Sequence, residues 1–262
     1  MDRPIDGHSQ RRWRIRRLRQ ATQFARGITL TATRWLAQQE AAVLVTVLGG
    51  LLALFGFVKI AEELGEGELA NFDEWLLSLL RVPGQPHIPI GPPWLLEAAQ
   101  DITALGGRTM LLAVTLFAIG YLALEGKHGA MWLVSIAAGG GGLLSTVLKH
   151  LFGRDRPDVV PHLVVVTSPS FPSGHAMLGA ILYLTLGALL ARFAARRRTR
   201  AYILTVALVV TFVVGSSRIY LGVHHPTDVL AGWCAGLVWA LICWLAARYL
   251  QKRGAVEKPG RS

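Results

Sequence analysis

Residues 217–228 read SRIYLGVHHPTD, and the apolar run VLAGWCAGLVWALICWLAA follows directly at 229–247. The run is close in length to the roughly 20 mostly apolar residues that cross a hydrocarbon core as a helix. An arginine, two histidines and an aspartate therefore stand at the edge of a predicted membrane span. Ionisable side chains at membrane depth are costly, and they usually mark a functional site.

Apolar runs of the same kind recur along the chain, which has 262 residues, 52% of them hydrophobic and 16% charged. We predict six spans, at about 41–61, 109–125, 130–148, 174–191, 202–216 and 228–247. The predicted fold class is all-α, a polytopic membrane helical bundle with six transmembrane helices in one unit, 41–247. The GGGG at 139–142 and the Gly232–Gly236 GxxxG are typical of close helix packing in lipid.

The basic residues predict the topology. A net charge of +11 would fit a nucleic-acid partner, but Lys and Arg gather between or outside the apolar runs. That distribution is typical of positive-inside topology and of contact with anionic headgroups, so the expected partner is the lipid bilayer and not nucleic acid. We interpret 1–40 as a basic amphipathic cytoplasmic segment, with an organellar transit peptide as the alternative, and 248–262 as a basic cytoplasmic tail.

The stretch 62–108 is too charged to span and too apolar to stand free in water. Four of its apolar residues fall at helical spacing, namely Leu69, Phe72, Leu76 and Leu79. A Pro-rich break at 82–94 precedes a second helical pattern over 94–105. We expect a pair of interfacial helices on the extracytoplasmic side, and a lid over a lipid-binding cleft is a hypothesis for their role.

Three polar stretches stand at helix ends on that same extracytoplasmic face: KHLFGRDRP at 149–157, FPSGHA at 171–176 and SRIYLGVHHPTD at 217–228. Several fixed cations, together with a helix start whose backbone N–H groups are free, suit an anion with several oxygens. Phosphate meets that description. From these stretches we select as candidate site residues three cations, two histidines, one carboxylate and a Ser-Gly pair: Lys149, Arg156, Arg218, His175, His224, Asp228, Ser173 and Gly174.

The remaining groups indicate a reaction. His224 precedes Asp228 by four residues, so that Asp228 can accept the Nδ1–H and leave Nε2 free to attack phosphorus. The intermediate would be a phosphohistidine. His175 would protonate the departing oxygen as general acid and later activate water as general base.

We expect neither a metal nor another cofactor. Lys149, Arg156 and Arg218 would neutralise charge on the equatorial oxygens of the transition state, which a divalent ion would otherwise do. Magnesium sites favour carboxylates, and this face is dominated by cations.

Simpler interpretations apply to the neighbouring residues. We read Arg154 with Asp155 and Asp158 as ion pairs within the loop. His225 is read as a structural neighbour of the site.

The three stretches resemble the pattern of the type 2 phosphatidic acid phosphatase (PAP2) superfamily, KxxxxxxRP, PSGH and SRxxxxxHxxxD, complete and in order. The resemblance implies a PAP2/haloperoxidase-like core in the family's integral-membrane branch. It implies His224 as nucleophile, Asp228 as its orienting partner and His175 as general acid. It also implies a phosphate pocket formed by Lys149, Arg156, Ser173, Gly174 and Arg218.

The expected function is metal-independent hydrolysis of a terminal phosphate from a membrane lipid phosphate or diphosphate. Candidate substrates are undecaprenyl diphosphate, phosphatidic acid and phosphatidylglycerol phosphate, at the extracytoplasmic face of a bacterial inner membrane. The alternatives are a lipid phosphotransferase with the same pocket, a vanadium-dependent haloperoxidase, and a non-catalytic membrane transporter or structural protein. Relatives of the haloperoxidase kind are soluble, and a non-catalytic protein would usually lack His224 or His175.

Overall fold

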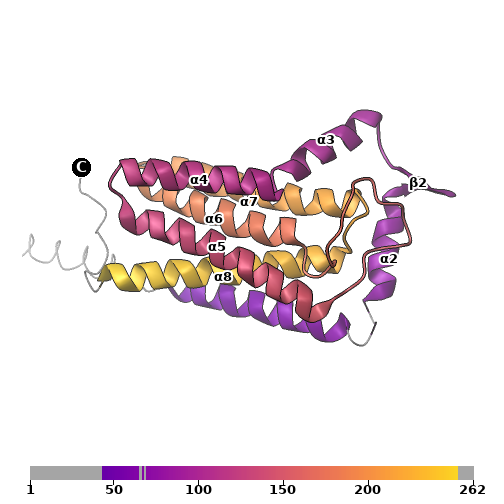
Figure 1. Cartoon of the computed structure of the whole chain (residues 1–262), viewed down its shortest axis with the longest axis horizontal. Coiled ribbons are helices and arrows are strands. Elements are labelled where there is room, and N and C mark those ends of the chain that lie inside the picture. The colour runs from indigo at the N-terminus through magenta and orange to yellow at the C-terminus, as the bar shows by residue number, and fades with distance from the viewer. Residues whose placement is uncertain (1–42, 65–66, 68, 253–262) are drawn as a thin grey trace, which may run out of the picture. The chain divides into compact units, whose positions relative to one another are not determined.

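The computed structural model describes residues 43–64, 67 and 69–252, whose helices and strands appear in Figure 1. The predicted basic segment 1–40 lies outside the described residues, as does most of the predicted tail 248–262. The chain divides into two units, Met1–Gly49 and Gly50–Ser262, and the contacts given below lie within the second. The elements in chain order are an N-terminal helix Val43–Leu64, α2 Ala70–Leu79, β1 Arg81–Val82, β2 Gln85–Pro89, α3 Pro93–Ala104, α4 Arg108–Leu124, α5 His128–Phe152, α6 Gly174–Phe193, α7 Arg197–Tyr220 and α8 Pro226–Lys252.

The described part of the chain carries five single helices that are long and apolar enough to cross a membrane: the N-terminal helix, α5, α6, α7 and α8. The helices α3 and α4 pass the same test together, as a pair bent by 47° at a short break. Counting that pair as one span gives six. The prediction of an all-α polytopic membrane bundle is therefore confirmed, and the predicted span at 109–125 corresponds to α4.

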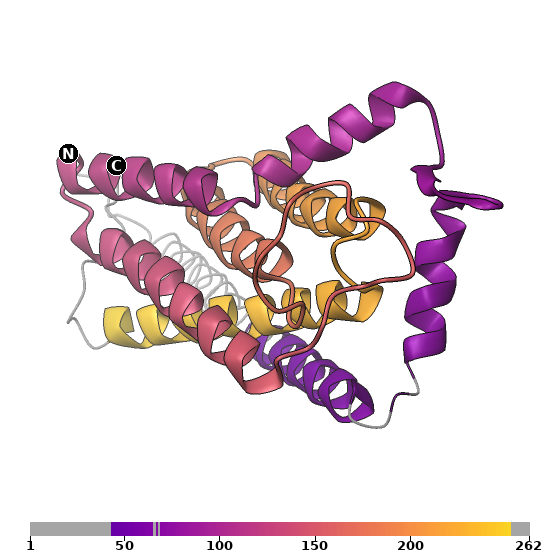
Figure 2. The same cartoon turned by 45° about the vertical axis from the view of Figure 1, so that its right-hand side comes forward.

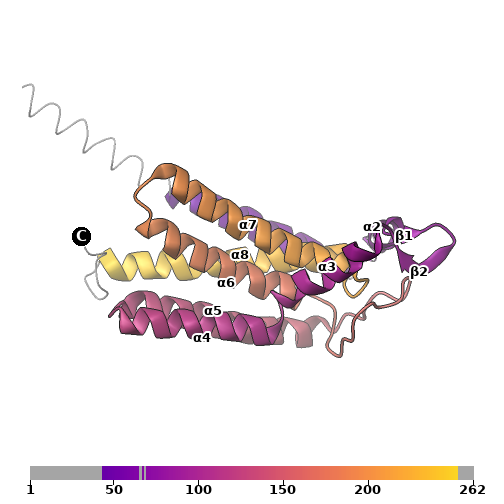
Figure 3. The ribbon, with the colours of Figure 1, turned by 90° about the horizontal axis from the view of Figure 1, so that it is seen from above.

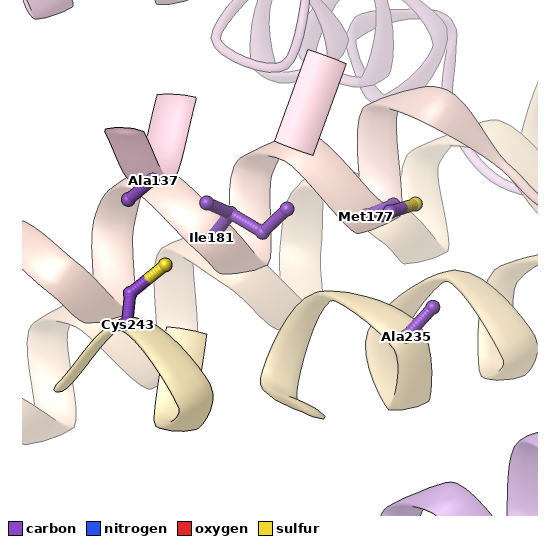
Figure 4. Packing of buried hydrophobic residues seen from close by; sticks show 5 residues of the cluster. All are labelled: Ala137, Met177, Ile181, Ala235 and Cys243. Carbon is purple, nitrogen blue, oxygen red and sulfur yellow. The ribbon is translucent and has the colours of Figure 1, made fainter. Parts of the chain in front are cut away.

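The helix α6 forms the centre of the bundle and packs against α5, α7 and α8. Its residues Met177 and Ile181 belong to one buried apolar cluster with Ala137 of α5 and with Ala235 and Cys243 of α8, as Figure 4 shows. Small and medium side chains at these positions let the helices approach closely, which is how helices associate in lipid.

Glycines set the closest approach in the bundle. A Cβ at Gly236 would lie 2.6 Å from the carbonyl oxygen of Met177, and one at Gly232 would lie 2.8 Å from that of Ser173. Within the GGGG run, a Cβ at Gly140 would lie 2.4 Å from the Trp239 ring. The predicted packing role of these small residues is confirmed. One consequence matters for function, because the Gly232 contact holds the start of α8 against the start of α6.

The segment between the N-terminal helix and α4 contains one element that the sequence did not predict. The strands β1 and β2 form a short antiparallel hairpin with Arg81 opposite Pro89, where we expected only a Pro-rich break. Gly84 turns the chain there with φ of +76°, a conformation that glycine adopts without strain. Figure 3 shows α2, the hairpin and α3 gathered at the end of the unit where α6 begins and α7 ends.

The helix α2 leaves half of its predicted apolar stripe exposed, since Leu69 and Leu76 are only half-buried and the other two residues are exposed. Phe72, Trp75 and Leu79 are exposed, whereas Asp73 and Leu77 are buried. The spacing of apolar residues therefore identified a helix correctly, but the side facing the bundle is the one that carries the carboxylate.

Candidate active site

The three polar stretches meet at one end of the bundle. The loop 153–173 leaves the end of α5 and crosses the end of the bundle at which α6 and α8 begin, as Figure 2 shows. The backbone N–H of Ser173, at the start of α6, donates to the carbonyl oxygen of Asp228 at the start of α8, over 2.9 Å. Two residues that are 55 positions apart in the sequence are thus hydrogen-bonded neighbours at this end of the bundle.

His224 and Asp228 form the contact that their spacing predicts. His224 lies in the loop between α7 and α8 and is 2% exposed, while Asp228, in the first turn of α8, is fully buried. Nδ1 of His224 lies 3.3 Å from Oδ2 of Asp228, and Nε2 lies 3.5 Å from Nη1 of Arg156. One ring nitrogen therefore faces a carboxylate and the other faces a cation. A proton on Nδ1 leaves the Nε2 lone pair as the reactive position.

Asp228 gathers further donors besides His224. Its Oδ1 accepts from Nη1 of Arg154 over 2.7 Å, and its Oδ2 accepts from Ser170 Oγ and, over 2.9 Å, from the backbone N–H of His225. A buried carboxylate is stable only when it is paired and hydrogen-bonded in this way. The set fixes the orientation of the carboxylate and, through it, that of the imidazole.

Lys149 and Arg156 are anchored by backbone carbonyls. Lys149, near the end of α5, is buried, and its Nζ donates to the carbonyl oxygen of Pro169 over 2.5 Å. Arg156 donates through Nε to the carbonyl oxygen of Ser168 over 2.8 Å, and through Nη1 to that of Val223. Both cations are thus held in place by the loops that surround His224.

Arg218 is buried in the last turn of α7, where it is 3% exposed. Its Nη1 donates to Oγ1 of Thr103 in α3 over 2.9 Å. The bent pair α3–α4 therefore forms another wall of the site, whereas the sequence suggested for 62–108 only the hypothesis of a lid over a lipid-binding cleft.

His175 stands in the first turn of α6, just after Ser173 and Gly174. A Cβ at Gly106, in the break between α3 and α4, would lie 3.1 Å from the Cβ of His175, so the break passes directly over this histidine. The other predicted ionisable site residues within electrostatic range of His175 are Arg218, His224, Arg156 and Lys149. The structure thus brings together all eight predicted site residues at one end of the bundle.

Two buried donors of the predicted phosphate pocket have no hydrogen-bond partner among the residues that the structure describes. They are Ser173 Oγ and Arg218 Nε. Donors of this kind suit the oxygens of an anion. Over the described ranges, no group of three or more His, Cys, Asp or Glu side chains is arranged to hold a metal ion.

Burial sets the protonation of the loop residues. It lowers the pKa of His224 to about 3, against the opposing effect of Asp228 and with further lowering by Arg156 and Arg218. Burial also lowers the pKa of Arg156, and the carboxylate of Asp228 partly offsets this. His224 is therefore a neutral imidazole at physiological pH, which is the form that can act as a nucleophile.

The reading of Arg154 as a partner of Asp155 and Asp158 is wrong. Arg154 instead pairs with Asp73, over 2.9 Å, and with Asp228, over 2.7 Å. The nearest acids in sequence are exposed, whereas these two are buried and bind the guanidinium more effectively.

Sequence reasoning missed four residues around the site: Asp73, Thr103, Ser170 and Thr227. A signal existed for Ser170, which stands three residues before Ser173. Nothing local marked Asp73 or Thr103.

Comparisons with known proteins show which family the chain is similar to. Residues 129–252 match the family model described as the PAP2 superfamily. The chain is 38% identical over 152 residues to phosphatidylglycerophosphatase B of Bacillus subtilis, which covers 57% of this chain and 73% of that relative. It is 30% identical over 124 residues to the undecaprenyl-diphosphatase of Sulfolobus acidocaldarius, covering 44% of this chain and 52% of that one.

A solved structure is also similar. The crystal structure of a transmembrane PAP2 type phosphatidylglycerolphosphate phosphatase from Bacillus subtilis matches with a TM-score of 0.69 and 28% sequence identity. The match covers 77% of this chain and 96% of that chain. The family model spans all three polar stretches, from 149 to 228.

Proposed function

The chain belongs to the PAP2 superfamily and is a multi-pass membrane lipid phosphatase, and we propose that it works through a phosphohistidine at His224. In the first step Nε2 of His224 attacks phosphorus, a P–N bond forms, and the P–O bond to the leaving group breaks. His175 gives its proton to the departing oxygen. In the second step His175 takes a proton from water, whose oxygen attacks phosphorus and releases inorganic phosphate from the imidazole.

One observation carries this proposal. Nδ1 of His224 lies against Asp228 while Nε2 lies beside Arg156, so the reactive nitrogen points toward cations. The charge that develops on the imidazole during attack is stabilised by Asp228. Charge on the phosphoryl oxygens is stabilised at the same moment by Arg156 and its neighbours.

The phosphate pocket in this proposal consists of Lys149, Arg156, Ser173, Gly174 and Arg218. The unpartnered Ser173 Oγ and Arg218 Nε supply donors, and the start of α6 supplies backbone N–H groups. Removing one such donor from a phosphoryl or acyl transition state costs about 2.7–4 kcal/mol of barrier. With three cations present, the reaction needs no metal ion.

We propose a polyprenyl diphosphate such as undecaprenyl diphosphate as the preferred substrate, with phosphatidic acid and phosphatidylglycerol phosphate as the other candidates. The names of the similar proteins include an undecaprenyl-diphosphatase and phosphatidylglycerol phosphate phosphatases. We propose that the site lies on the extracytoplasmic face of a bacterial inner membrane. The exposed arginines where α6 ends and α7 begins, at the ends of those helices away from the site, support this because basic segments beside a span favour the cytoplasm.

The test is phosphate release by the purified full chain in detergent. Short-chain phosphatidic acid, phosphatidylglycerol phosphate and farnesyl diphosphate are offered with excess EDTA, and kcat/KM is compared among them. We expect release from at least one lipid at a rate within about twofold of that with Mg²⁺, since the cations replace the metal. A strict requirement for Mg²⁺ would contradict the metal-free pocket. A preference for phosphatidic acid or for phosphatidylglycerol phosphate would contradict the proposed substrate.

A further inference from the structure

A carboxylate outside the three polar stretches is built into the support of the nucleophile. Asp73, on α2, is fully buried. Its Oδ1 accepts the backbone N–H of Thr227 over 3.0 Å, and its Oδ2 accepts Thr227 Oγ1 over 2.6 Å. Thr227 immediately precedes Asp228. The helix α2 is therefore fastened to the first turn of α8, three residues after His224.

Arg154 bridges the two buried carboxylates. Its Nη2 donates to Asp73 over 2.9 Å and its Nη1 to Asp228 over 2.7 Å, and Nη1 also reaches Thr227 Oγ1 over 2.9 Å. A guanidinium is planar, so fixing both ends leaves it one orientation. Arg154 thereby occupies Oδ1 of Asp228 and leaves Oδ2 to face His224.

The same segment also holds the other end of the nucleophile loop. Arg81, the first residue of β1, is 4% exposed and donates through Nη1 to the carbonyl oxygen of Tyr220, the last residue of α7, over 3.0 Å. Tyr220 Oη donates in turn to the carbonyl oxygen of Ile90 over 2.7 Å. A Cβ at Gly222 would lie 2.6 Å from Arg81 Nη2, so the loop lies directly on this guanidinium.

We propose that Asp73 is a positioning residue for the phosphatase reaction, acting through Arg154 on Asp228 and so on His224. This inference rests on the proposed function, in which His224 is the nucleophile. The segment 69–92 thus holds the nucleophile loop at both ends, at Thr227 through Asp73 and at Tyr220 through Arg81. Loss of the Asp73 carboxylate frees one end of the Arg154 guanidinium, which then holds Asp228 less rigidly. The expected defect lies in the attack on phosphorus and not in phosphate binding.

The experiment compares Asp73→Asn with Glu74→Gln in the full chain in detergent. Glu74 is the next residue on α2 and is exposed, so it controls for the loss of a carboxylate from that helix. We expect Asp73→Asn to lower kcat by about 10- to 100-fold with KM changed less than about threefold, as for other groups that orient a reacting residue. The rate of phosphoenzyme formation should fall by the same factor. Glu74→Gln should retain both values within about twofold.

A double-mutant cycle with Arg154→Gln separates positioning from general support. If Asp73 acts through Arg154, then adding Asp73→Asn to the Arg154→Gln variant should lower kcat by less than about threefold beyond the loss that Arg154→Gln causes alone. Full multiplication of the two losses would overturn the proposal. So would a folded Asp73→Asn variant with wild-type kcat, or a loss of activity that only matches the loss of folded protein in size-exclusion and thermal-stability measurements.

A second variant serves if Asp73→Asn does not fold. Arg154→Lys keeps the positive charge but replaces the planar guanidinium that holds both carboxylates, and it should lower kcat several-fold with KM retained. An unchanged kcat in that variant would overturn the proposal. The wild type and His224→Ala run beside these variants. If the wild type forms no phosphoenzyme, the His224 mechanism itself is refuted. If the wild type forms the phosphoenzyme and Asp73→Asn forms it at the same rate, only the positioning role of Asp73 is refuted.

Discussion

The two ends of α7 carry the same side chain in opposite surroundings. Arg197, Arg198 and Arg200 at its start are exposed, whereas Arg218 in its last turn is 3% exposed and donates to Thr103. Exposed arginines beside a span can pair with headgroups and water at little cost. A buried guanidinium is costly unless a ligand or partner compensates for its burial. We infer from the comparison that exposed arginines at a helix end report the membrane topology, whereas a buried arginine at the other end of the same helix is a ligand-binding group.

The largest effect that the comparison predicts is on activity. Arg218→Ala should lower kcat by about 10²- to 10³-fold, because a donor to the transition state is lost. Arg198→Ala, at the other end of the same helix, should change kcat by less than about twofold. Steady-state phosphate release by the two purified variants is the measurement. Equal losses in both variants would mean that burial does not distinguish the two kinds of arginine.

A smaller effect is predicted for the pH dependence of phosphoenzyme formation at His224, near the end of α7 that carries Arg218. A nucleophilic histidine with the ordinary pKa of about 6.5 would be protonated by pH 5 and would lose about 30-fold in rate. Burial lowers the pKa of His224 to about 3, so its imidazole stays neutral as the pH falls from 8 to 5. As the pH falls from 8 to 5, the rate of phosphoenzyme formation should therefore show no decrease centred near pH 6.5 that is caused by protonation of His224.

Two substrates whose phosphates ionise at different pH values provide the control for that profile. If the pH at which the rate falls on the acid side differs between the two substrates, the fall is caused by protonation of the substrate phosphate. If the rate falls near pH 6.5 with both substrates, the neutral state of His224 is contradicted.

The smallest effect concerns the sidedness of the two ends. Asp158→Cys, in the exposed part of the 153–173 loop, should react with an impermeant thiol reagent on intact cells, and Arg198→Cys only after the cells are permeabilised. Both variants should keep activity within about twofold, because both positions are exposed. The parent chain with Cys234 and Cys243 gives the background. The reverse pattern of labelling would invert the proposed topology.

The spans were predictable because apolar runs of membrane length have few alternative structures. The sequence predicted a span beginning near 202, whereas α7 begins at Arg197, since basic residues are good helix formers and extend the helix out of the lipid. The hairpin at 81–89 was not predicted, because two of its strand residues are prolines, which are rare in strands. The break between α3 and α4 was predictable, because the helical pattern over 94–105 and the span at 109–125 leave 106–108 between them, where Gly106 and Gly107 stand.

The sequence could predict that the site residues lie close together. Successive spans alternate in direction, so the three polar stretches fall at helix ends on the same side of the membrane, where they can meet. The support around the site residues was not predictable. Asp73 lies 81 positions from Arg154 and 154 positions from Thr227, and it lies on a helix that leaves half of its predicted apolar stripe exposed. The sequence neighbours Asp155 and Asp158 were the natural partners for Arg154, yet the structure selects the buried acids. A contact of that range depends on the packing of α2 against the start of α8, which no local pattern records.

The central claim is that His224 carries the phosphoryl group, and trapping that group tests it most directly. The wild type is mixed with lipid substrate carrying a labelled terminal phosphate, quenched in alkali and digested, and the label is mapped by mass spectrometry. We predict an acid-labile phosphoryl group on the peptide that contains His224, absent from His224→Ala, whose turnover should fall by at least about 10⁴-fold. Label on His175, or full turnover in His224→Ala, would contradict the account.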